Sequence, residues 1–205
     1  SNSSGARRHQ YDAETFAKMR TNVGQPIFGV DVKITDDDNE ELPWDGVAFG
    51  ALKVSGPWIC SSYFKLDGSS AHEEDGWFET GDVATIDSRG NVSITDRTKD
   101  VIKSGGEWIS SIEIENCATG HPQVAEAAVI GRNHPKWGER PLLIIVKSGE
   151  DDVAPDELKG YLDGKIAKWW MPDDVQFIDE MPHTATGKIQ KMKLREMFDN
   201  YQFPA

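Results

Sequence analysis

The sequence contains GWFETGD at Gly76–Asp82, DRTKDVIKSGGEW at Asp96–Trp108 and PHTATGKIQK at Pro182–Lys191. The periodicity of the apolar residues changes inside the second stretch, from mostly strand-like before it to mixed helix and strand after it. The change falls on DRTKD, at Asp96–Asp100, which is a short polar connector. We therefore expect an α+β protein of two compact parts, joined at a place where a hinge can work.

The first part, residues 25–97, is predicted to be rich in β-strands. The apolar residues of VDVKI alternate with polar ones, as in a strand with one buried face. GDVATID and NVSITD follow each other closely, which predicts a hairpin with Gly90 at a positive backbone angle. Residues 1–24 are expected to be a leader, in which residues 11–20 can form a short helix.

The second part, residues 98–205, is predicted to be a small α+β domain. AEAAVIG, PLLIIVK and DVQFID are typical of strands with buried side chains. We expect helices at residues 110–118, 155–168 and 189–198. The second of these helices has a proline in its first turn, followed by two acids at its positive end. About a hundred residues are enough for a domain with a core of its own.

The composition excludes several classes of partner. A formal net charge of -13 argues against nucleic acid and anionic membranes, which require a basic surface. No apolar run approaches the roughly 20 residues that cross a bilayer, and the first ten residues lack the apolar centre of a secretory signal. We therefore predict a cytoplasmic protein with no membrane span. Cys60 and Cys117 are too few for a disulfide framework and lack metal-ligand spacing, so buried reduced thiols and no metal site are expected.

Two residues have side chains suited to a nucleotide. Asp82 follows Thr-Gly directly, and a rigidly held carboxylate can accept two hydrogen bonds from the vicinal diol of a ribose. The alternative is an aspartate that caps its own turn. Arg97 has a permanent charge and a forked set of donors that fits ribose and phosphate oxygens. Its alternative role is an ion pair with an acidic neighbour.

A local positive field lies at Thr184–Arg195, which contains four basic residues and no acidic one. Lys188 follows Thr-Gly in a loop before the last expected helix. Its ammonium can neutralise negative charge that grows on a bound substrate during a reaction. The alternative for Lys188 is an exposed lysine near a helix start. For Lys191, Lys193 and Arg195 we expect a solvated helix face.

The remaining candidates are structural in our interpretation. Gly105 and Gly106 predict a turn, or a backbone that approaches a ligand closely. HPKWGER, at His134–Arg140, is at least as typical of packing as of function. KWWM contains Trp169, Trp170 and Met171, which belong either to the core or to a docking surface. The histidines lack a partner nucleophile motif, so no catalytic histidine is predicted.

The three motifs resemble, in type and order, the late core motifs of the adenylate-forming (ANL superfamily) acyl-CoA synthetases. The likeness runs from about Gly24 to about Arg195. It is greatest to the ligases of short- and medium-chain fatty acids and of methylmercaptopropionate. The resemblance implies that residues 25–97 are a distorted barrel-like subdomain at the end of the N-terminal domain. It also implies that residues 98–205 are the mobile C-terminal domain.

The resemblance also implies roles for individual residues. Asp82 and Arg97 would bind the nucleotide, and Lys188 would be the catalytic lysine of adenylation. Lys99 would be the hinge, where this family usually has aspartate or lysine. The channel for coenzyme A would be lined by Lys103, Ser104, Gly105, Gly106, Glu107 and Trp108.

Enzymes of this family convert a carboxylic acid to acyl-AMP and then to acyl-CoA. The resemblance thus implies ATP with Mg²⁺, coenzyme A and a small carboxylic acid as ligands. The glycine- and hydroxyl-rich phosphate loop of the family has no counterpart in these 205 residues. We therefore expect the C-terminal part of a larger enzyme, inactive without its upstream N-terminal domain. The alternatives are transfer of the acyl group to a carrier-protein thiol or to oxygen, and a non-catalytic interaction module.

Overall fold

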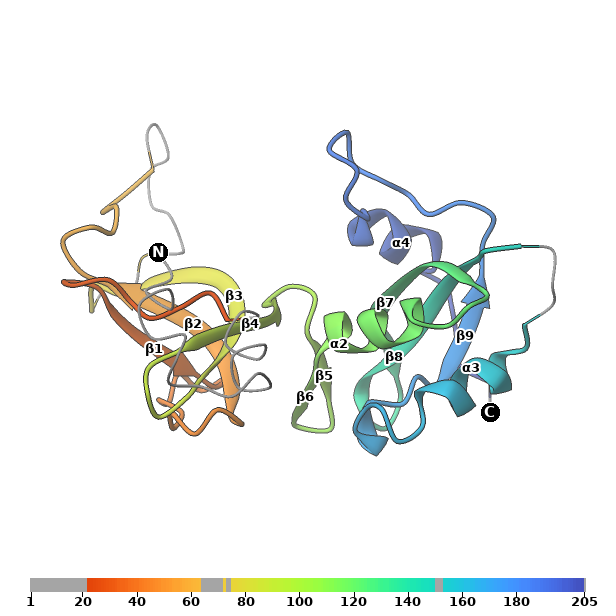
Figure 1. Cartoon of the computed structure of the whole chain (residues 1–205), viewed down its shortest axis with the longest axis horizontal. Coiled ribbons are helices and arrows are strands. Elements are labelled where there is room, and N and C mark those ends of the chain that lie inside the picture. Colours follow the sequence, from red (N-terminus) through yellow and green to blue (C-terminus); the bar gives the residue numbers. More distant parts are fainter. Residues whose placement is uncertain (1–21, 64–71, 73–74, 150–152, 205) are drawn as a thin grey trace, which may run out of the picture. The chain divides into compact units, whose positions relative to one another are not determined.

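The computed structural model of the chain describes residues 22–63, 72, 75–149 and 153–204. The chain forms two compact units, Ser1–Lys99 and Asp100–Ala205, each with a sheet of its own (Figure 1). The combination of sheets with helices confirms the predicted α+β class. The short helix expected at residues 11–20 lies outside the described residues.

The first unit is built on an antiparallel sheet with the strand order β1-β2-β3-β4. Its strands are β1 (Asp31–Thr35), β2 (Phe49–Ser55), β3 (Phe78–Ile86) and β4 (Val92–Arg97). A buried apolar cluster contains Ile34, Leu52, Ala84, Ile86 and Val92. Val32 packs against this cluster, so the alternation of VDVKI places Val32 and Ile34 on the same side, as a strand requires.

The turn between β3 and β4 confirms the predicted hairpin. Gly90 has a φ of 78°, and its N–H donates to the carbonyl of Asp87 at 2.8 Å. The Asp87 carboxylate accepts hydrogen bonds from the backbone N–H groups of Arg89 and Asn91, both at 2.9 Å. Partial burial acts to raise the pKa of Asp87, but hydrogen bonds from Asn91 and Arg89 outweigh it and lower the pKa. The turn therefore fixes the register of the two strands.

The second unit has a sheet with the order β6-β5-β8-β7, and β9 runs parallel to β8. Its strands are β5 (Ile102–Ser104), β6 (Glu107–Ile109), β7 (Val124–His134), β8 (Gly138–Lys147) and β9 (Asp174–Phe177). Its helices are α2 (Ser111–Thr119), α3 (Pro155–Leu162), the 3-10 turn η2 (Lys168–Trp170) and α4 (Lys191–Met197). The predicted strands AEAAVIG, PLLIIVK and DVQFID correspond to β7, β8 and β9.

Helices cover both faces of the second sheet, which explains the continuous apolar run of β8. Leu143 and Ile145 pack in one buried cluster with residues of α2 and α3. Leu142 and Ile144 alternate with them and pack in a second cluster with Leu194 of α4. Successive side chains of a strand point to opposite faces, so α4 lies on the face opposite α2 and α3.

The polar side chains of α4 tie it to the rest of the second unit. Lys191 Nζ lies 2.6 Å from the Ser111 hydroxyl and 2.7 Å from Glu115 Oε1. The same oxygen of Glu115 accepts the backbone N–H of Val129 on β7 at 2.7 Å. Arg195 pairs with Asp100 at 2.8 Å. The expectation of a solvated face was therefore wrong for Lys191 and Arg195, because both enter ion pairs.

Two other expectations need correction. The helix that starts at Pro155 ends at Leu162, not at residue 168, because Asp163 is extended and Gly164 has a φ of 75°. A positive φ of this kind interrupts a helix. Cys60 is exposed and Cys117 is half-buried, so buried thiols were the wrong expectation for Cys60.

Candidate functional site

Asp82 and Arg97 lie directly opposite each other on β3 and β4. Arg97 Nε is 2.9 Å from Asp82 Oδ1. The Asp82 side chain is 26% exposed and the Arg97 side chain is 58% exposed, so both keep polar surface in contact with solvent. Arg97 thus does form an ion pair, as its alternative role required, and its partner is the other nucleotide candidate. A carboxylate oriented by a guanidinium can accept hydrogen bonds from a diol.

The backbone around Asp82 is fixed by short polar contacts. The Thr80 hydroxyl accepts the N–H of Asp82 at 3.2 Å and donates to the carbonyl of Leu52 at 2.9 Å. The N–H of Thr98 donates to the carbonyl of Gly81 at 3.0 Å. Gly81 has a φ of 76°, and a Cβ built there would meet nothing within 4 Å. Glycine is therefore favoured there by the backbone angle and not by lack of space.

The stretch from Lys103 to Trp108 forms a hairpin of β5 and β6. Ser104 pairs with Glu107 across a two-residue turn, in which Gly105 and Gly106 have φ values of 60° and 88°. Two successive positive φ values are the mark of the tight hairpin turn that matches the twist of antiparallel strands. The predicted turn is confirmed, and its two glycines are required by its backbone angles.

Aromatic rings pack closely against this turn. The N–H of Gly105 donates to the carbonyl of Trp137 at 2.8 Å, and a Cβ on Gly105 would lie 3.1 Å from the Trp137 ring. The rings of Trp137 and Trp169 meet edge to face, 4.9 Å apart. Trp169, Trp170 and Met171 pack against the core as partly buried side chains. HPKWGER and KWWM therefore both contribute to packing.

Lys188 lies on a second tight hairpin, just before α4. The N–H of Gly187 donates to the carbonyl of Thr184 at 2.9 Å, and Thr184 N–H donates to the carbonyl of Lys188 at 2.8 Å. Gly187 has a φ of 79°, as expected of the glycine that closes a three-residue hairpin loop. Lys188 is exposed, and within the described part of the chain its ammonium has no hydrogen-bond or ion-pair partner.

The predicted site residues thus fall into separate groups. Asp82 and Arg97 adjoin each other on the sheet of the first unit. Lys188 and the hairpin of Lys103–Trp108 both belong to the second unit. Lys99 is exposed, lies in the turn that follows β4, and is the last residue of the first unit.

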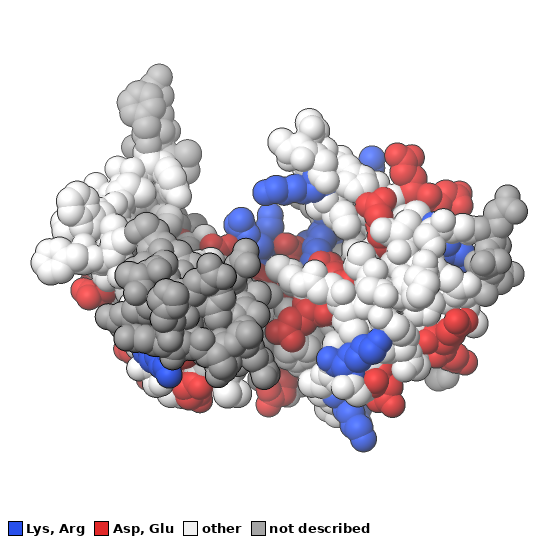
Figure 2. Space-filling model, in the orientation of Figure 1, with Lys and Arg blue, Asp and Glu red and all other residues white. Residues whose placement is uncertain are grey.

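Neither a metal site nor a membrane helix occurs in the described structure. Among the residues that it covers, no three His, Cys, Asp or Glu side chains form a group that could hold a metal ion. No helix of the described residues is long and apolar enough to span a bilayer. Figure 2 shows acidic side chains on the visible surface, in keeping with the formal net charge of -13.

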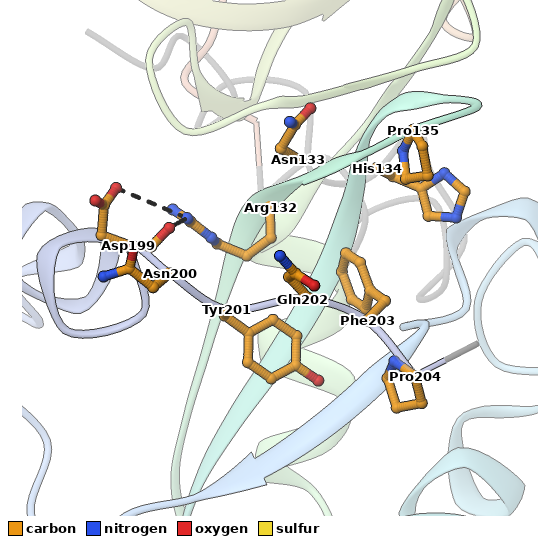
Figure 3. Close-up of a pocket in the computed structure, with 10 residues that line it drawn as sticks. All are labelled: Arg132, Asn133, His134, Pro135, Asp199, Asn200, Tyr201, Gln202, Phe203 and Pro204. Carbon is orange, nitrogen blue, oxygen red and sulfur yellow. Dashed lines mark hydrogen bonds and ion pairs between the residues drawn. The ribbon is translucent and has the colours of Figure 1, made fainter.

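A surface groove of about 720 Å³ lies in the second unit, between the end of β7 and the C-terminal tail (Figure 3). It is lined by Arg132, Asn133, His134, Pro135, Asp199, Asn200, Tyr201, Gln202, Phe203 and Pro204. None of the predicted site residues is among them. Arg132 spans the groove to Asp199, 3.9 Å away, which holds the tail against β7.

The tail is also held by a hydrogen bond from the Tyr201 hydroxyl to the Asp174 carboxylate. Partial burial acts to raise the pKa of Asp174, but hydrogen bonds from Tyr201, Val175 and Gln176 lower the pKa below its ordinary value of 3.8. Burial and the same hydrogen bond raise the pKa of the Tyr201 phenol.

Tyr201→Phe is expected to lower the free energy of unfolding by about 1 kcal/mol near neutral pH, because it removes a hydrogen bond to a charged group. The folded pKa of Asp174 is depressed, so this stabilisation is present above pH 3.8 and is lost as the pH falls below it. Urea unfolding of both proteins at several pH values measures the difference. Tyr161→Phe is the control, since no described carboxylate accepts a hydrogen bond from that hydroxyl. A difference that did not change with pH would contradict the prediction.

Sequence reasoning missed Arg140 as a structural centre. Its guanidinium is buried and bonds to Ser104, Asp173 and the carbonyls of Trp169 and Met171. A signal was available, because Arg140 stands directly before the apolar run PLLIIV, where a charge must be paired when buried.

Comparison with known proteins connects these observations to a family. Residues 113–188 match the family of AMP-binding enzyme C-terminal domains. The chain is 54% identical over 193 residues to the 3-methylmercaptopropionyl-CoA ligase of Ruegeria lacuscaerulensis, a match that covers 94% of this chain and 36% of the ligase. It is 48% identical over 180 residues to the medium-chain-fatty-acid–CoA ligase of Ectopseudomonas oleovorans, a match that covers 88% of this chain and 33% of that ligase. The chain spans about a third of the length of the curated relatives it matches.

Solved structures share the fold. ATP-bound MatB from Rhodopseudomonas palustris superposes with a TM-score of 0.75 at 35% identity, covering 89% of this chain and 37% of MatB. The o-succinylbenzoate CoA synthetase of Bacillus subtilis, in complex with an acyl-adenylate intermediate, gives a TM-score of 0.75 at 31% identity. The match covers 90% of this chain and 37% of the synthetase. Residues 113–188 therefore form an AMP-binding enzyme C-terminal domain, in a chain whose relatives are acyl-CoA ligases.

Proposed function

We propose that this chain is the C-terminal part of an ATP-dependent acyl-CoA synthetase that converts a short- or medium-chain carboxylic acid to acyl-AMP and then to acyl-CoA. The observation that carries the proposal is the state of Lys188. Its neighbours Lys191 and Arg195 are held in ion pairs, whereas Lys188 is exposed on a tight hairpin without a partner among the described residues. Its charge is thus available to a substrate.

In the first half-reaction, Lys188 stabilises the negative charge that develops as the carboxylate oxygen attacks the α-phosphorus of ATP. The bond to pyrophosphate breaks as the acyl-AMP bond forms. A flexible side chain carried by a rigid hairpin can reach the reacting oxygens without reorganisation of the backbone. Lys188 does not need to transfer a proton, because the attacking carboxylate is already ionised.

Asp82 and Arg97 are proposed to bind the nucleotide. The Asp82 carboxylate accepts hydrogen bonds from the ribose hydroxyls, and Arg97 orients that carboxylate through the 2.9 Å contact. Mg²⁺ bound to ATP would neutralise charge on its phosphates.

In the second half-reaction, the thiol of coenzyme A attacks the acyl carbonyl of acyl-AMP, and AMP leaves. We propose that the hairpin of Lys103–Trp108 lines the path of the pantetheine arm, and that the second unit turns about Lys99 between the two steps. An exposed residue at the junction of two compact units supports the hinge role. The proposed partners are the acid, ATP, coenzyme A and the upstream domain, in the cytoplasm.

The test is carboxylate-dependent exchange of pyrophosphate into ATP, with a panel of short- and medium-chain acids. The full-length protein that carries this chain is expected to catalyse exchange, and the folded 205-residue chain alone is not. Exchange by the chain alone would show that it contains a complete phosphate site. Absence of both exchange and acyl-CoA formation in the full-length protein would refute the proposed activity.

Asp82→Asn in the full-length protein is expected to raise the KM for ATP by about 10- to 100-fold, the effect of weakening hydrogen bonds to a charged acceptor. Steady-state exchange at varied ATP concentration measures it. Asp75→Asn is the matched control, because Asp75 is an exposed aspartate just before the same motif. An equal effect of the two substitutions would contradict the role of Asp82.

A second acceptor chemistry has some structural support. The amide bond synthetase McbA from Marinactinospora thermotolerans shares the fold with a TM-score of 0.73 at 32% identity. The acyl-adenylate could therefore be passed to an acceptor other than coenzyme A. Mass spectrometry of the products formed with coenzyme A, with amines and with carrier-protein thiols distinguishes these acceptors.

A further inference from the structure

The guanidinium of Arg140 uses all three of its nitrogens. Nε and Nη2 both lie 2.8 Å from Oδ1 of Asp173. Nη1 donates to the Ser104 hydroxyl at 3.2 Å and to the carbonyl of Trp169 at 2.9 Å, and Nη2 donates to the carbonyl of Met171 at 3.0 Å. The side chain is only 7% exposed. One buried cation therefore joins three segments of the second unit.

One of these segments is the hairpin that carries Gly105. Ser104 is fully buried and directly precedes the turn. The guanidinium also lies over the Trp169 ring, 4.6 Å from its centre, and that ring would be 3.4 Å from a Cβ on Gly105. Arg140 thus holds both the stem of the turn, through Ser104, and one of the rings that pack against it.

We propose that Arg140 is a positioning residue for the hairpin of Lys103–Trp108, and that it is required for thioester formation more than for adenylation. This inference rests on the proposed function of the hairpin. Two guanidinium nitrogens that share Oδ1 of Asp173 fix the guanidinium, and its other contacts fix Ser104 and the carbonyls of Trp169 and Met171. Lysine could not replace this arrangement, because its ammonium has no planar fork.

The second unit offers a matched control. Arg132 pairs with Arg140 across β7 and β8. Its side chain is 13% exposed, and it bonds to the carbonyls of Arg195 and Asp199. Within the described part of the chain it makes no hydrogen bond or ion pair to the hairpin of Lys103–Trp108. Arg132→Ala and Arg140→Ala both remove a mostly buried arginine, but only Arg140→Ala should release the hairpin.

The first measurement is hydrogen exchange in the 205-residue chain. Arg140→Ala should speed exchange of the Gly105 amide, which is bonded to the Trp137 carbonyl, by about tenfold relative to the amides of β7 and β8. Arg132→Ala should leave that ratio unchanged. An unchanged ratio in Arg140→Ala, or the same increase in both variants, would overturn the positioning role whatever the enzyme does.

The second measurement separates the half-reactions in the full-length protein. Arg140→Ala and Arg140→Lys are expected to lower thioester formation from supplied acyl-AMP by about 10- to 100-fold more than they lower pyrophosphate exchange. Arg132→Ala should lower both alike. Equal loss of both steps in the Arg140 variants would show a general structural role. If Arg140→Ala speeds exchange of the Gly105 amide but does not lower thioester formation selectively, Arg140 positions the hairpin and the proposed role of the hairpin in thioester formation is wrong.

Discussion

Replacing Lys188 with alanine in the full-length protein is expected to lower carboxylate-dependent pyrophosphate exchange by about 10²- to 10³-fold, the usual effect of removing one electrostatic group from a transition state. The substitution removes a charge without disturbing the fold, because Lys188 is exposed and unpaired among the described residues. Thioester formation from supplied acyl-AMP should persist, because in that step the thiol attacks the acyl carbonyl and no new bond to the α-phosphorus forms.

The control for Lys188 is Lys193→Ala. Lys193 is exposed on α4, five residues further along the same acid-free segment. Its replacement with alanine should leave the rates of both half-reactions unchanged. Equal loss of adenylation and thioester formation in Lys188→Ala would contradict the assignment of Lys188 to the first step. An equal loss of pyrophosphate exchange in Lys193→Ala would show that the overall positive charge of the segment, and not Lys188 itself, supports adenylation.

Lys99→Pro is expected to affect the half-reactions in the opposite way to Lys188→Ala, with adenylation kept and acyl-CoA formation lost. Proline fixes its own φ near −65° and restricts the residue before it, so the chain can no longer turn freely at this position. If the second unit must rotate between the two steps, pyrophosphate exchange should persist while overall acyl-CoA formation falls by about 10²-fold. Burst kinetics with acyl-AMP trapped on the enzyme measure the two steps separately.

Lys99→Ala serves as the control, because it removes the side chain and leaves the backbone free. It should retain most of the turnover. Unchanged turnover in Lys99→Pro would rule out a hinge at this residue. Loss of turnover in both variants would assign the effect to the lysine side chain.

The sequence predicts the architecture well where the pattern is local and periodic. Alternation in VDVKI and the unbroken run PLLIIVK distinguish a sheet with one apolar cluster from a sheet packed on both faces. The hairpin at Gly90 and the turn at Gly105 are likewise predictable, since glycine supplies positive φ. The end of α3 was not predicted, because helical periodicity continues to Lys168 while Gly164 interrupts the backbone.

The site is less predictable, because its organisation depends on contacts between distant residues. The 2.9 Å pair of Asp82 and Arg97 requires the register of β3 and β4, which includes an irregularity after Val83. Lys191 and Lys188 stand three residues apart in one basic segment, yet only Lys191 meets an acid, and that acid is Glu115 on α2. Local sequence separates Lys188, which follows Thr-Gly, from Lys191, but it does not predict that Lys191 pairs with an acid on α2.

The contact of Glu115 with β7 has a consequence for association between molecules. Among the described strands, β7 ends the sheet, and a terminal strand offers free backbone donors to which another chain can add. At Val129 this donor is already occupied by Glu115, whose charge is balanced by Lys191. An incoming strand would have to displace a carboxylate and break an ion pair. The same contact that fastens α4 therefore also protects the middle of the sheet edge against aggregation.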